Sequence, residues 1–232
     1  MWTSYARFAS FGIGLVRTDP DAPKHKGISM LAIPMDAEGI DVRPLRQITG
    51  ESEFNEVFFD RVPVPRENLI GEENNGWRVA GTTLANERGT SFVWKEQVLH
   101  EVARDLLWKR SIERSLTDDP LVRQKLAQSW MEVEIFRLHN ARTLTRLARG
   151  EQIGPESSIV KLFWTEMSQK LAENAGSIFG ADALRTGPGA LDRGRWQRAM
   201  LWSRAASIAG GTSEIQRNII GERLLGLPRE PN

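Results

Sequence analysis

The spacing of hydrophobic residues along the chain changes character once, near Gly76. Before that residue, short apolar runs alternate with turn clusters such as Asp36-Ala37-Glu38-Gly39, a pattern that is typical of β-strands. Val62-Pro63-Val64-Pro65 then forces an extended connector, because each proline keeps the preceding residue out of the helical region. The pattern predicts antiparallel strands over residues 11–17, 27–34, 40–47 and 54–59.

After this point apolar residues recur with a period of about 3.6, which predicts long helices. The predicted helices begin near residues 77, 119, 155, 194 and 212. Asp119 and Pro120 mark a start clearly, because aspartate is a good N-cap and proline is tolerated in the first turn. Gly180 marks a stop, and Gly210-Gly211 breaks the fourth helix before the fifth begins.

The segment after Gly210-Gly211 predicts the last helix. Thr212 or Ser213 would cap it, and Ser213 with Gln216 fits a capping box, in which each side chain bonds the other residue's backbone amide. Together the two patterns predict an α+β chain. An antiparallel β-domain over residues 1–70 is followed by an all-α, four-helix-bundle-like domain over residues 71–232.

Composition excludes several classes of function. The chain has 31 basic and 30 acidic residues, so it lacks the basic excess typical of nucleic-acid binding proteins. It has no cysteine, which excludes disulfides and thiolate chemistry and suits a reducing compartment, so we expect a cytoplasmic protein. No apolar stretch is long enough to span a membrane.

Common catalytic patterns are also missing from the sequence. The three histidines, His25, His100 and His139, do not have metal-ligand spacing, so no metal site is predicted. There is no phosphate-binding glycine loop between a strand and a helix, and no G-x-S-x-G motif of a hydrolase.

Three segments carry the remaining functional signal: Trp2-Thr3-Ser4, Asn86-Glu87-Arg88 and the stretch from Ala209 to Arg217. Each has a structural explanation by itself, as a buried aromatic, a solvated ion pair, and a helix break followed by a cap. In this order, with a β-rich half followed by a helical half, they resemble the acyl-CoA dehydrogenase family. The most specific part of the resemblance is residues 211–230, GTSEIQRNIIGERLLGLPRE.

The resemblance extends along the whole chain and implies a larger protein. Members of the family have an N-terminal helical domain, a middle β-domain and a C-terminal four-helix bundle. Residues 1–70 would be the C-terminal part of the middle β-domain, and residues 71–232 the helical bundle domain. The first half is then either removed by truncation, which we favour, or supplied by a separate polypeptide.

The resemblance also implies an activity. Family members oxidise an acyl-CoA thioester to the 2,3-enoyl-CoA: a carboxylate removes the α-proton while a hydride leaves the β-carbon for N5 of FAD. Trp2 would then pack against the flavin ring and Ser4 would hydrogen-bond near N5, while Gly211, Thr212 and Gln216 would contact FAD. Two alternatives stay open: Trp2 as a plain core residue, and Thr212 as a helix cap alone.

The chain departs from the commonest family pattern at the catalytic base. Many members carry a glutamate immediately before the Gly-Thr of the last motif, but this chain has Gly210 there, which cannot take a proton. A subgroup that includes isovaleryl-CoA and long-chain dehydrogenases carries the base in a Glu-Arg pair on the first bundle helix. Glu87 is therefore expected to be the base and Arg88 to help position it. A solvated glutamate and a structural ion pair are the alternatives.

The implied partners are an acyl-CoA substrate, electron-transfer flavoprotein as electron acceptor, and a second subunit in a dimer or tetramer. The family shares FAD sites between subunits through an arginine and a phenylalanine that follow the first bundle helix. Arg114 is the candidate here, but the expected aromatic-glycine pair is missing, which fits a hetero-oligomer as well as a homo-oligomer. The competing hypotheses are a non-catalytic partner subunit or inactive fragment of a heteromeric acyl-CoA dehydrogenase, and an oxidase-like flavoenzyme.

Overall fold

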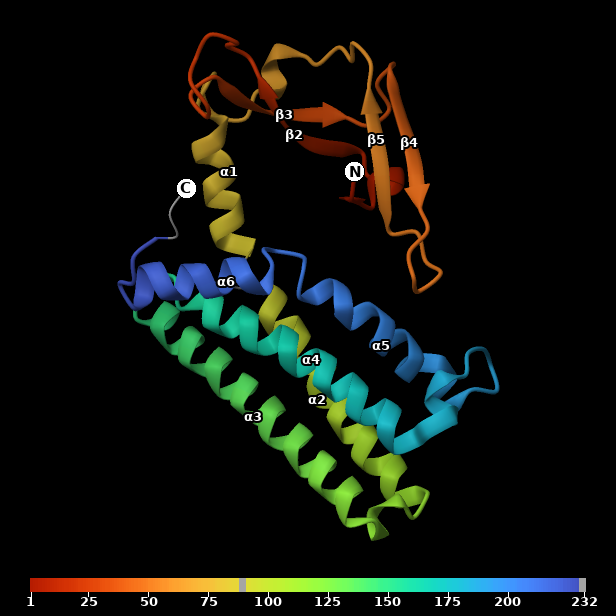
Figure 1. Cartoon of the computed structure of the whole chain (residues 1–232). Coiled ribbons are helices and arrows are strands. Elements are labelled where there is room, and N and C mark those ends of the chain that lie inside the picture. Colours follow the sequence, from red (N-terminus) through yellow and green to blue (C-terminus); the bar gives the residue numbers. More distant parts are fainter. Residues whose placement is uncertain (88–90, 230–232) are drawn as a thin grey trace. The chain divides into compact units, whose positions relative to one another are not determined.

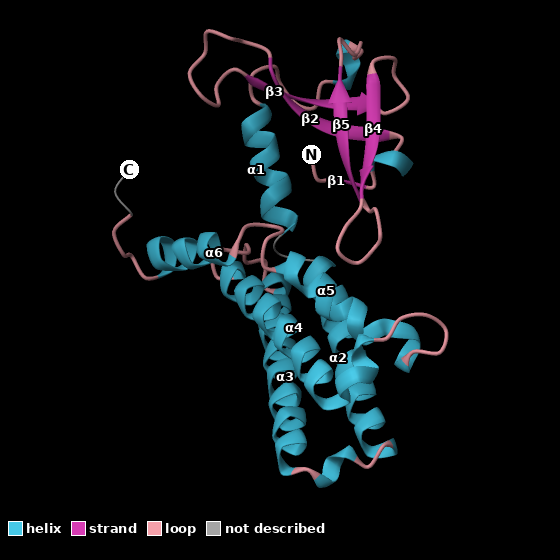
Figure 2. Cartoon of the chain, turned by 45° about the vertical axis from the view of Figure 1, so that its right-hand side comes forward, coloured by secondary structure: helices cyan, strands magenta, loops and turns pink. Residues whose placement is uncertain are grey.

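The structure is a computed structural model that describes residues 1–87 and 91–229. The chain divides into two compact units, Met1–Ala85 and Asn86–Asn232. The first holds small antiparallel sheets and the second is helical, so the predicted α+β class is confirmed (Figures 1 and 2). The domain boundary expected after residue 70 stays a prediction. The first compact unit extends further because α1 (Gly76–Glu87) starts against the sheet, where a Cβ at Gly76 would lie 2.4 Å from the carbonyl carbon of Ser29.

Two antiparallel sheets form the N-terminal unit. In the first sheet β5 (Phe54–Phe59) lies between β1 (Thr3–Ser4) and β4 (Ile40–Leu45). In the second, β2 (Phe11–Arg17) pairs with β3 (Ile28–Pro34), with Phe11 opposite Pro34 and Arg17 opposite Ile28. All four strands expected from the sequence are present, and β2 and β5 have the expected bounds. Strand β1 is too short to give a sequence pattern.

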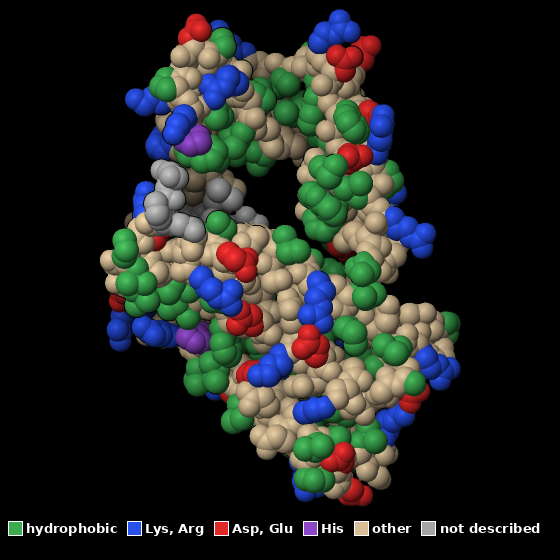
Figure 3. Space-filling view, viewed as in Figure 1, with side chains coloured by type: hydrophobic (Ala, Val, Ile, Leu, Met, Phe, Trp, Pro, Cys, Tyr) green, Lys and Arg blue, Asp and Glu red, His purple; other side chains and the backbone are tan. Residues whose placement is uncertain are grey.

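The two strands of the second sheet differ in burial. β3 buries Met30 and Ile33, which are 4% and 6% exposed. β2 instead exposes every second residue: the first three of these, Phe11, Ile13 and Leu15, are apolar, and the last is Arg17. Figure 3 shows hydrophobic side chains gathering on the surface of this unit. The alternation that predicts β2 therefore marks an apolar face that the described chain leaves uncovered.

Helix α4 is the centre of the C-terminal unit and contacts four other helices. These elements are α2 (Ser91–Glu113), α3 (Pro120–Ala148), α4 (Ser157–Phe179), α5 (Arg195–Ala206) and α6 (Ser213–Ile219). Figure 1 shows α6 crossing one end of α4. The core between the helices includes Leu107, Val133, Phe136 and Ala175, none of which has measurable exposure.

Short helical turns occur near the ends of several of these elements. They are η1 (Ala6–Phe8), η2 (Arg66–Asn68), η3 (Leu116–Asp118), η4 (Gly180–Leu184), η5 (Leu191–Gly194) and the π-helical η6 (Ile220–Leu224). The helix expected over residues 77–113 falls on α1 and α2, and residues 88–90 lie outside the described residues.

The predicted start signal of α3 and the predicted stop signal of α4 are confirmed. The Asp119 carboxylate accepts a hydrogen bond from the Leu121 amide at 2.8 Å, and α3 begins at Pro120. α4 ends before Gly180. The apolar residues of α3 are only partly buried: Trp130 is 44% exposed, although it lies three residues before the fully buried Val133 at helical spacing. It lies beside Trp108 of α2 on the outer side of the α2–α3 contact, and Arg104 stacks on its ring.

Candidate functional site

A tight turn containing Gly210, Gly211 and Thr212 joins α5 to α6. Both glycines have positive φ, 65° and 99°, in the region that glycine adopts without steric cost. A Cβ at Gly211 would lie 2.7 Å from Nε2 of Gln216, whereas a Cβ at Gly210 would have no atom within 4 Å. Gly211 therefore permits close approach to Gln216, and the space beside Gly210 is open.

Two side chains hold the carbonyl groups of this turn. Gln216 is fully buried, and its Nε2 donates to the carbonyl oxygens of Gly210 at 3.1 Å and Gly211 at 3.2 Å. Nζ of Lys161, on α4, donates to the Gly211 carbonyl at 2.7 Å. Oε1 of Gln216 is buried and has no hydrogen-bond partner among the described residues. The amide cannot be flipped to pair it, because Nε2 must face the two carbonyls.

The start of α6 confirms one part of the sequence prediction, a cap at Thr212 or Ser213, and contradicts another, the capping box. Thr212 is the N-cap, and its hydroxyl accepts a hydrogen bond from the Ile215 amide at 3.3 Å. The predicted capping box of Ser213 with Gln216 is wrong, because the Gln216 side chain bonds the carbonyls before the helix instead of a backbone amide. Spacing alone predicts a capping box here. It cannot show that a buried carbonyl pair competes for the same amide group.

The charges around the turn are unevenly solvated. Burial lowers the pKa of Lys161, while the negative charge of Glu214 acts in the opposite direction. Hydrogen bonds from its own backbone amide and from the Thr212 hydroxyl lower the pKa of the exposed Glu214 carboxyl. Lys161 is 8% exposed, so its ammonium lies in an environment that disfavours a charge.

The residues expected at the flavin ring belong to the N-terminal unit. Trp2 is 63% exposed and makes an edge-to-face contact with Phe54, with ring centroids 5.8 Å apart. It also has a φ of 67°, which is rare for an aromatic residue. Ser4 is exposed and lies opposite Phe54 in the register of β1 with β5. Within the described chain the Trp2 indole is therefore available for a ligand, and its role stays a prediction.

The candidate base lies at the edge of the described residues. Glu87 is the last residue of α1, and its side chain and the whole of Arg88 lie outside what the structure describes. Arg114 follows α2 and pairs with Asp182 of η4. The end of α2 lies at the opposite end of the bundle from α6 (Figure 1), so Arg114 and the glycine turn are not brought together within the C-terminal unit.

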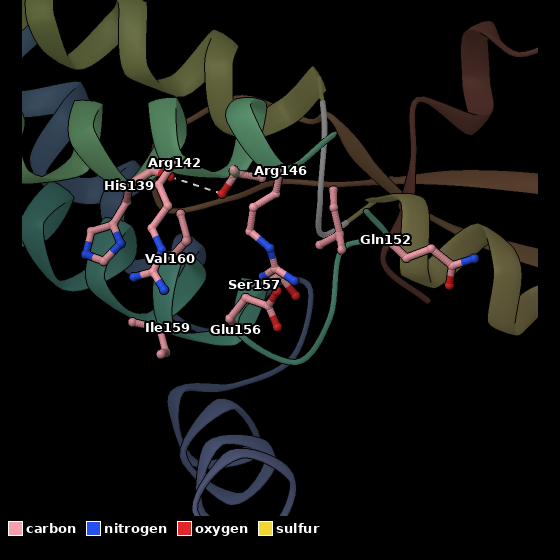
Figure 4. Close-up of a pocket in the computed structure, with 10 residues that line it drawn as sticks. His139, Arg142, Arg146, Gln152, Glu156, Ser157, Ile159 and Val160 are labelled. Atoms are coloured by element: carbon pink, nitrogen blue, oxygen red, sulfur yellow. Dashed lines mark hydrogen bonds and ion pairs between the residues drawn. The ribbon is translucent and has the colours of Figure 1, made fainter. Parts of the chain in front are cut away.

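Two hollows of the described surface lie away from the glycine turn. A cavity of about 70 Å³ lies between the end of α3 and the start of α4, where Figure 4 shows His139, Arg142, Arg146 and Glu156. It is large enough to hold several water molecules. A wider depression of about 400 Å³ lies between α2 and α3 and is lined by Trp108 and Trp130. Neither is lined by a predicted site residue.

Two further absences hold for the described residues. No group of three histidine, aspartate or glutamate side chains lies close enough together to hold a metal ion. No helix in the part of the chain that the structure describes is both long enough and apolar enough to cross a membrane.

Sequence reasoning missed Lys161. The residue lies in an apolar stretch of α4, fifty positions before the carbonyl it contacts, and no local pattern connects the two. A lysine at a buried position of a predicted helix is the one signal that could have singled it out, because lysine is almost never fully buried unless it is paired.

Comparisons with known proteins agree with the arrangement of elements. A family model described as "Acyl-CoA dehydrogenase, C-terminal domain" matches residues 74–225. Acyl-CoA dehydrogenase IpdE1 of Mycolicibacterium smegmatis is 40% identical over 230 residues, which cover 99% of this chain and 57% of the relative. Acyl-CoA dehydrogenase FadE34 of Mycobacterium tuberculosis is 39% identical, and the match covers 99% of this chain and 30% of the relative. The chain thus spans little more than half of IpdE1.

Solved structures of acyl-CoA dehydrogenases also match this chain along almost its whole length. The Tcur3481-Tcur3483 steroid ACAD superposes with a TM-score of 0.90 at 28% identity. The ChsE4-ChsE5 complex from Mycobacterium tuberculosis superposes with a TM-score of 0.88 at 30% identity. Each match covers 99% of this chain and 60% of the solved chain.

Proposed function

This chain belongs to the acyl-CoA dehydrogenase family, and we propose that it is the C-terminal part of an FAD-dependent acyl-CoA dehydrogenase. The proposed reaction oxidises the α,β-bond of an acyl-CoA thioester to the 2,3-enoyl-CoA. When bound, FAD supplies the two-electron oxidation. The protein supplies a base for the α-proton and groups that bind cofactor and substrate.

The observation that carries the proposal is the turn at Gly210 and Gly211. Both residues are left-handed, open space lies beside Gly210, and the turn precedes a helix that Thr212 caps. A backbone without side chains can approach a flat or phosphorylated ligand closely. The unpartnered Oε1 of the buried Gln216 adds an acceptor that needs a donor. These residues fit FAD: Gly211 and Thr212 are its proposed contacts, and the buried Gln216 is proposed to act on FAD through the turn that it holds.

Trp2 and Ser4 are the proposed contacts of the flavin ring. The exposed indole of Trp2 offers a large flat apolar face, and it is held at an uncommon backbone angle beside Phe54. The Ser4 hydroxyl can both donate and accept a hydrogen bond. An apolar ring left open to solvent is what a ring-binding surface requires before its ligand binds.

Glu87 is the proposed base, since Gly210 cannot serve. A carboxylate placed at the end of α1 could take the α-proton if substrate excludes water from it, because desolvation favours the protonated carboxyl. Arg88 is the proposed positioning residue. Arg114 is the proposed contact with FAD of a second subunit.

A bulky acyl group is the proposed substrate class. One structural relative is described as a steroid ACAD, and the small residues Gly81 and Ala85 on α1 precede the proposed base. We also propose electron-transfer flavoprotein as the electron acceptor and a dimer or tetramer as the assembly.

A second candidate function is a partner subunit without catalytic activity. The chain has glycine where many family members have their catalytic glutamate, and it spans 57% of IpdE1. The apolar face of β2, with Phe11, Ile13 and Leu15, would then be an assembly surface.

The test uses this chain completed with the N-terminal segment that the relatives carry, either fused or as a co-expressed subunit. In a Glu87→Gln variant we expect FAD to bind normally and its visible absorbance to persist when acyl-CoA is added without oxygen. The matched control is Glu73→Gln, an exposed carboxylate just before α1, which is expected to bleach as the unmodified protein does. Full bleaching of the Glu87→Gln protein would remove Glu87 from the mechanism. A completed protein that binds no flavin would favour the partner subunit.

A further inference from the structure

Lys161 is a buried cation whose hydrogen-bond partner is neutral. Its side chain extends from α4, is 8% exposed, and donates to the Gly211 carbonyl. It makes no ion pair within 4.0 Å among the described residues, and an ammonium has three donors. Burying a charge without a close counter-charge is costly. The ammonium of Lys161 therefore has a role at this position that a neutral apolar side chain could not fill.

The position of the carbonyls fixes the direction of the amides. No peptide bond in the described chain is cis, so the N–H of each peptide points away from its C=O. The Gly210 carbonyl shares a peptide with the Gly211 amide, and the Gly211 carbonyl shares one with the Thr212 amide. Because Gln216 and Lys161 hold both carbonyls on their own side, both amides point to the opposite side.

Those two amides are unoccupied donors. In the part of the chain that the structure describes, neither the Gly211 amide nor the Thr212 amide has a hydrogen-bond partner. A pair of adjacent amides in a fixed orientation suits an oxygen acceptor. Two neighbouring glycines with positive φ would otherwise leave this orientation poorly defined, because glycine is the most flexible residue.

We propose that Lys161 is a positioning residue: with Gln216 it holds the carbonyls of the glycine turn inward and so presents the Gly211 and Thr212 amides to an oxygen of the bound cofactor. This inference rests on the proposed function for the identity of the ligand. The anchor is firm, because α4 packs at the centre of the bundle and the neighbouring Val160 and Trp164 are buried. The charge also raises the positive potential at the site.

The test compares Lys161→Met and Lys161→Arg in the completed protein with FAD. Methionine keeps the apolar stem and removes the donor, so we expect FAD to bind about tenfold more weakly, which corresponds to about 1.4 kcal/mol. The arginine variant keeps a charged donor and is expected to recover part of the loss. The absorbance spectrum of the bound flavin is expected to shift in the methionine variant, whereas the melting temperature of the bundle changes little.

The matched control is Arg217→Gln. Arg217 of α6 pairs with Glu166 of α4, so it connects the same two helices at an exposed place without touching the turn. This variant is expected to bind FAD within about twofold of the unmodified protein, since exposed ion pairs contribute little. Equal weakening in Arg217→Gln and Lys161→Met would overturn the proposal, and so would unchanged binding in Lys161→Met.

A second measurement separates this inference from the proposed function. Hydrogen–deuterium exchange of the Ser213 amide, which donates to the Ser207 carbonyl across the turn at 3.2 Å, is expected without FAD to be faster in Lys161→Met than in Arg217→Gln, because the turn is no longer held. If the completed protein binds no FAD, the proposed function fails while faster exchange still supports the hold on the turn. Unchanged exchange would contradict the hold, whatever the ligand.

Discussion

The two units bury their apolar residues very differently. In the bundle, Phe136 and Val133 are completely buried between helices, and the core runs along most of α4. In the N-terminal unit, Phe11 and Ile13 are 61% and 64% exposed, and Phe59 is 52% exposed. The bundle thus holds the hydrophobic area that stabilises a fold, whereas the β unit presents much of its own to the outside. The comparison implies that a covering partner would stabilise the β unit, whose strand β2 exposes an apolar face, whereas the bundle already has a buried core of its own.

Polar contacts connect β3 to its neighbouring segments in the β unit. The Ser29 hydroxyl is fully buried, lies 2.6 Å from the Thr18 hydroxyl and accepts a hydrogen bond from the Asn74 amide at 2.8 Å. Asn68 reaches the Ala32 carbonyl at 3.0 Å. These bonds connect β3 to the segments that precede α1.

The largest expected effect comes from one substitution in each unit, and the pair tests the difference in burial directly. Phe136→Ala removes a fully buried ring and leaves a cavity, so we expect it to destabilise the bundle by about 3–5 kcal/mol. Phe11→Ala removes a ring that is already mostly in water, and we expect less than about 1 kcal/mol in this chain. Denaturant unfolding followed by circular dichroism measures both.

The same Phe11→Ala substitution, measured in the completed protein, tests whether the apolar face of β2 becomes covered. In the protein completed with the N-terminal segment, the same Phe11→Ala change is expected to cost about 2–4 kcal/mol, because the ring would then be covered. If Phe11→Ala costs equally little in both forms, the apolar face of β2 is not an assembly surface. An equal and large cost of Phe11→Ala and Phe136→Ala in this chain would show that the two units do not differ.

Local signals explain which parts of this fold could be predicted. Strands β2 and β5 were predicted with their exact bounds, because period-two apolar patterns between turn residues depend on neighbours in sequence. The start of α3 at Pro120 follows from the Asp119 cap for the same reason. Exposure could not be predicted from these patterns: Phe11 and Trp130 fit their apolar stripes and are nevertheless open to solvent.

In the candidate site, too, the local features could be predicted from the sequence and the tertiary contacts could not. Gly211 and Thr212 were singled out from their motif, and the turn and cap that the structure shows are local features. The contacts that complete the turn are not local, since Lys161 reaches Gly211 from another helix and Gln216 turns back to bond the carbonyls before its own helix. Tertiary contacts of this kind leave no trace in residue spacing.

A smaller effect is expected from the same serine-to-alanine change in each unit. Ser29→Ala removes a fully buried hydroxyl and leaves the half-buried Asn74 amide without its acceptor, so we expect a loss of about 1–2 kcal/mol in the β unit. Ser111 of α2 is equally buried, but its hydroxyl donates to the Leu107 carbonyl within the same helix. That carbonyl keeps its helical hydrogen bond in Ser111→Ala, so we expect a loss of less than about 0.5 kcal/mol. The reverse order of the two losses would show that polar contacts are not what distinguishes the β unit.

The smallest expected effect is the pH dependence of the bundle. Burial lowers the pKa of His100, which lies edge-on to Phe136 and Trp164. The unfolded chain therefore binds more protons below about pH 6.5, and the bundle loses stability as pH falls from there toward the lower folded pKa, by at most about 1.4 kcal/mol per pH unit. Thermal melts of His100→Asn at several pH values are expected to show a shallower acid loss than the unmodified chain.

Glu96 provides the opposite variant for this last test. Its carboxylate lies 3.8 Å from Nδ1 of His100, and burial raises its pKa. A raised carboxyl pKa means that the folded state takes up the proton first, so Glu96 gains stability for the bundle as pH falls through that range. Glu96→Gln removes this gain, and its acid loss is expected to be steeper. Because partial burial also lowers the pKa of His139, a residual slope is expected in His100→Asn. We expect the pH dependence to arise in the bundle core, where His100 and Glu96 lie. Equal slopes in Glu96→Gln and His100→Asn would show that it arises outside this core.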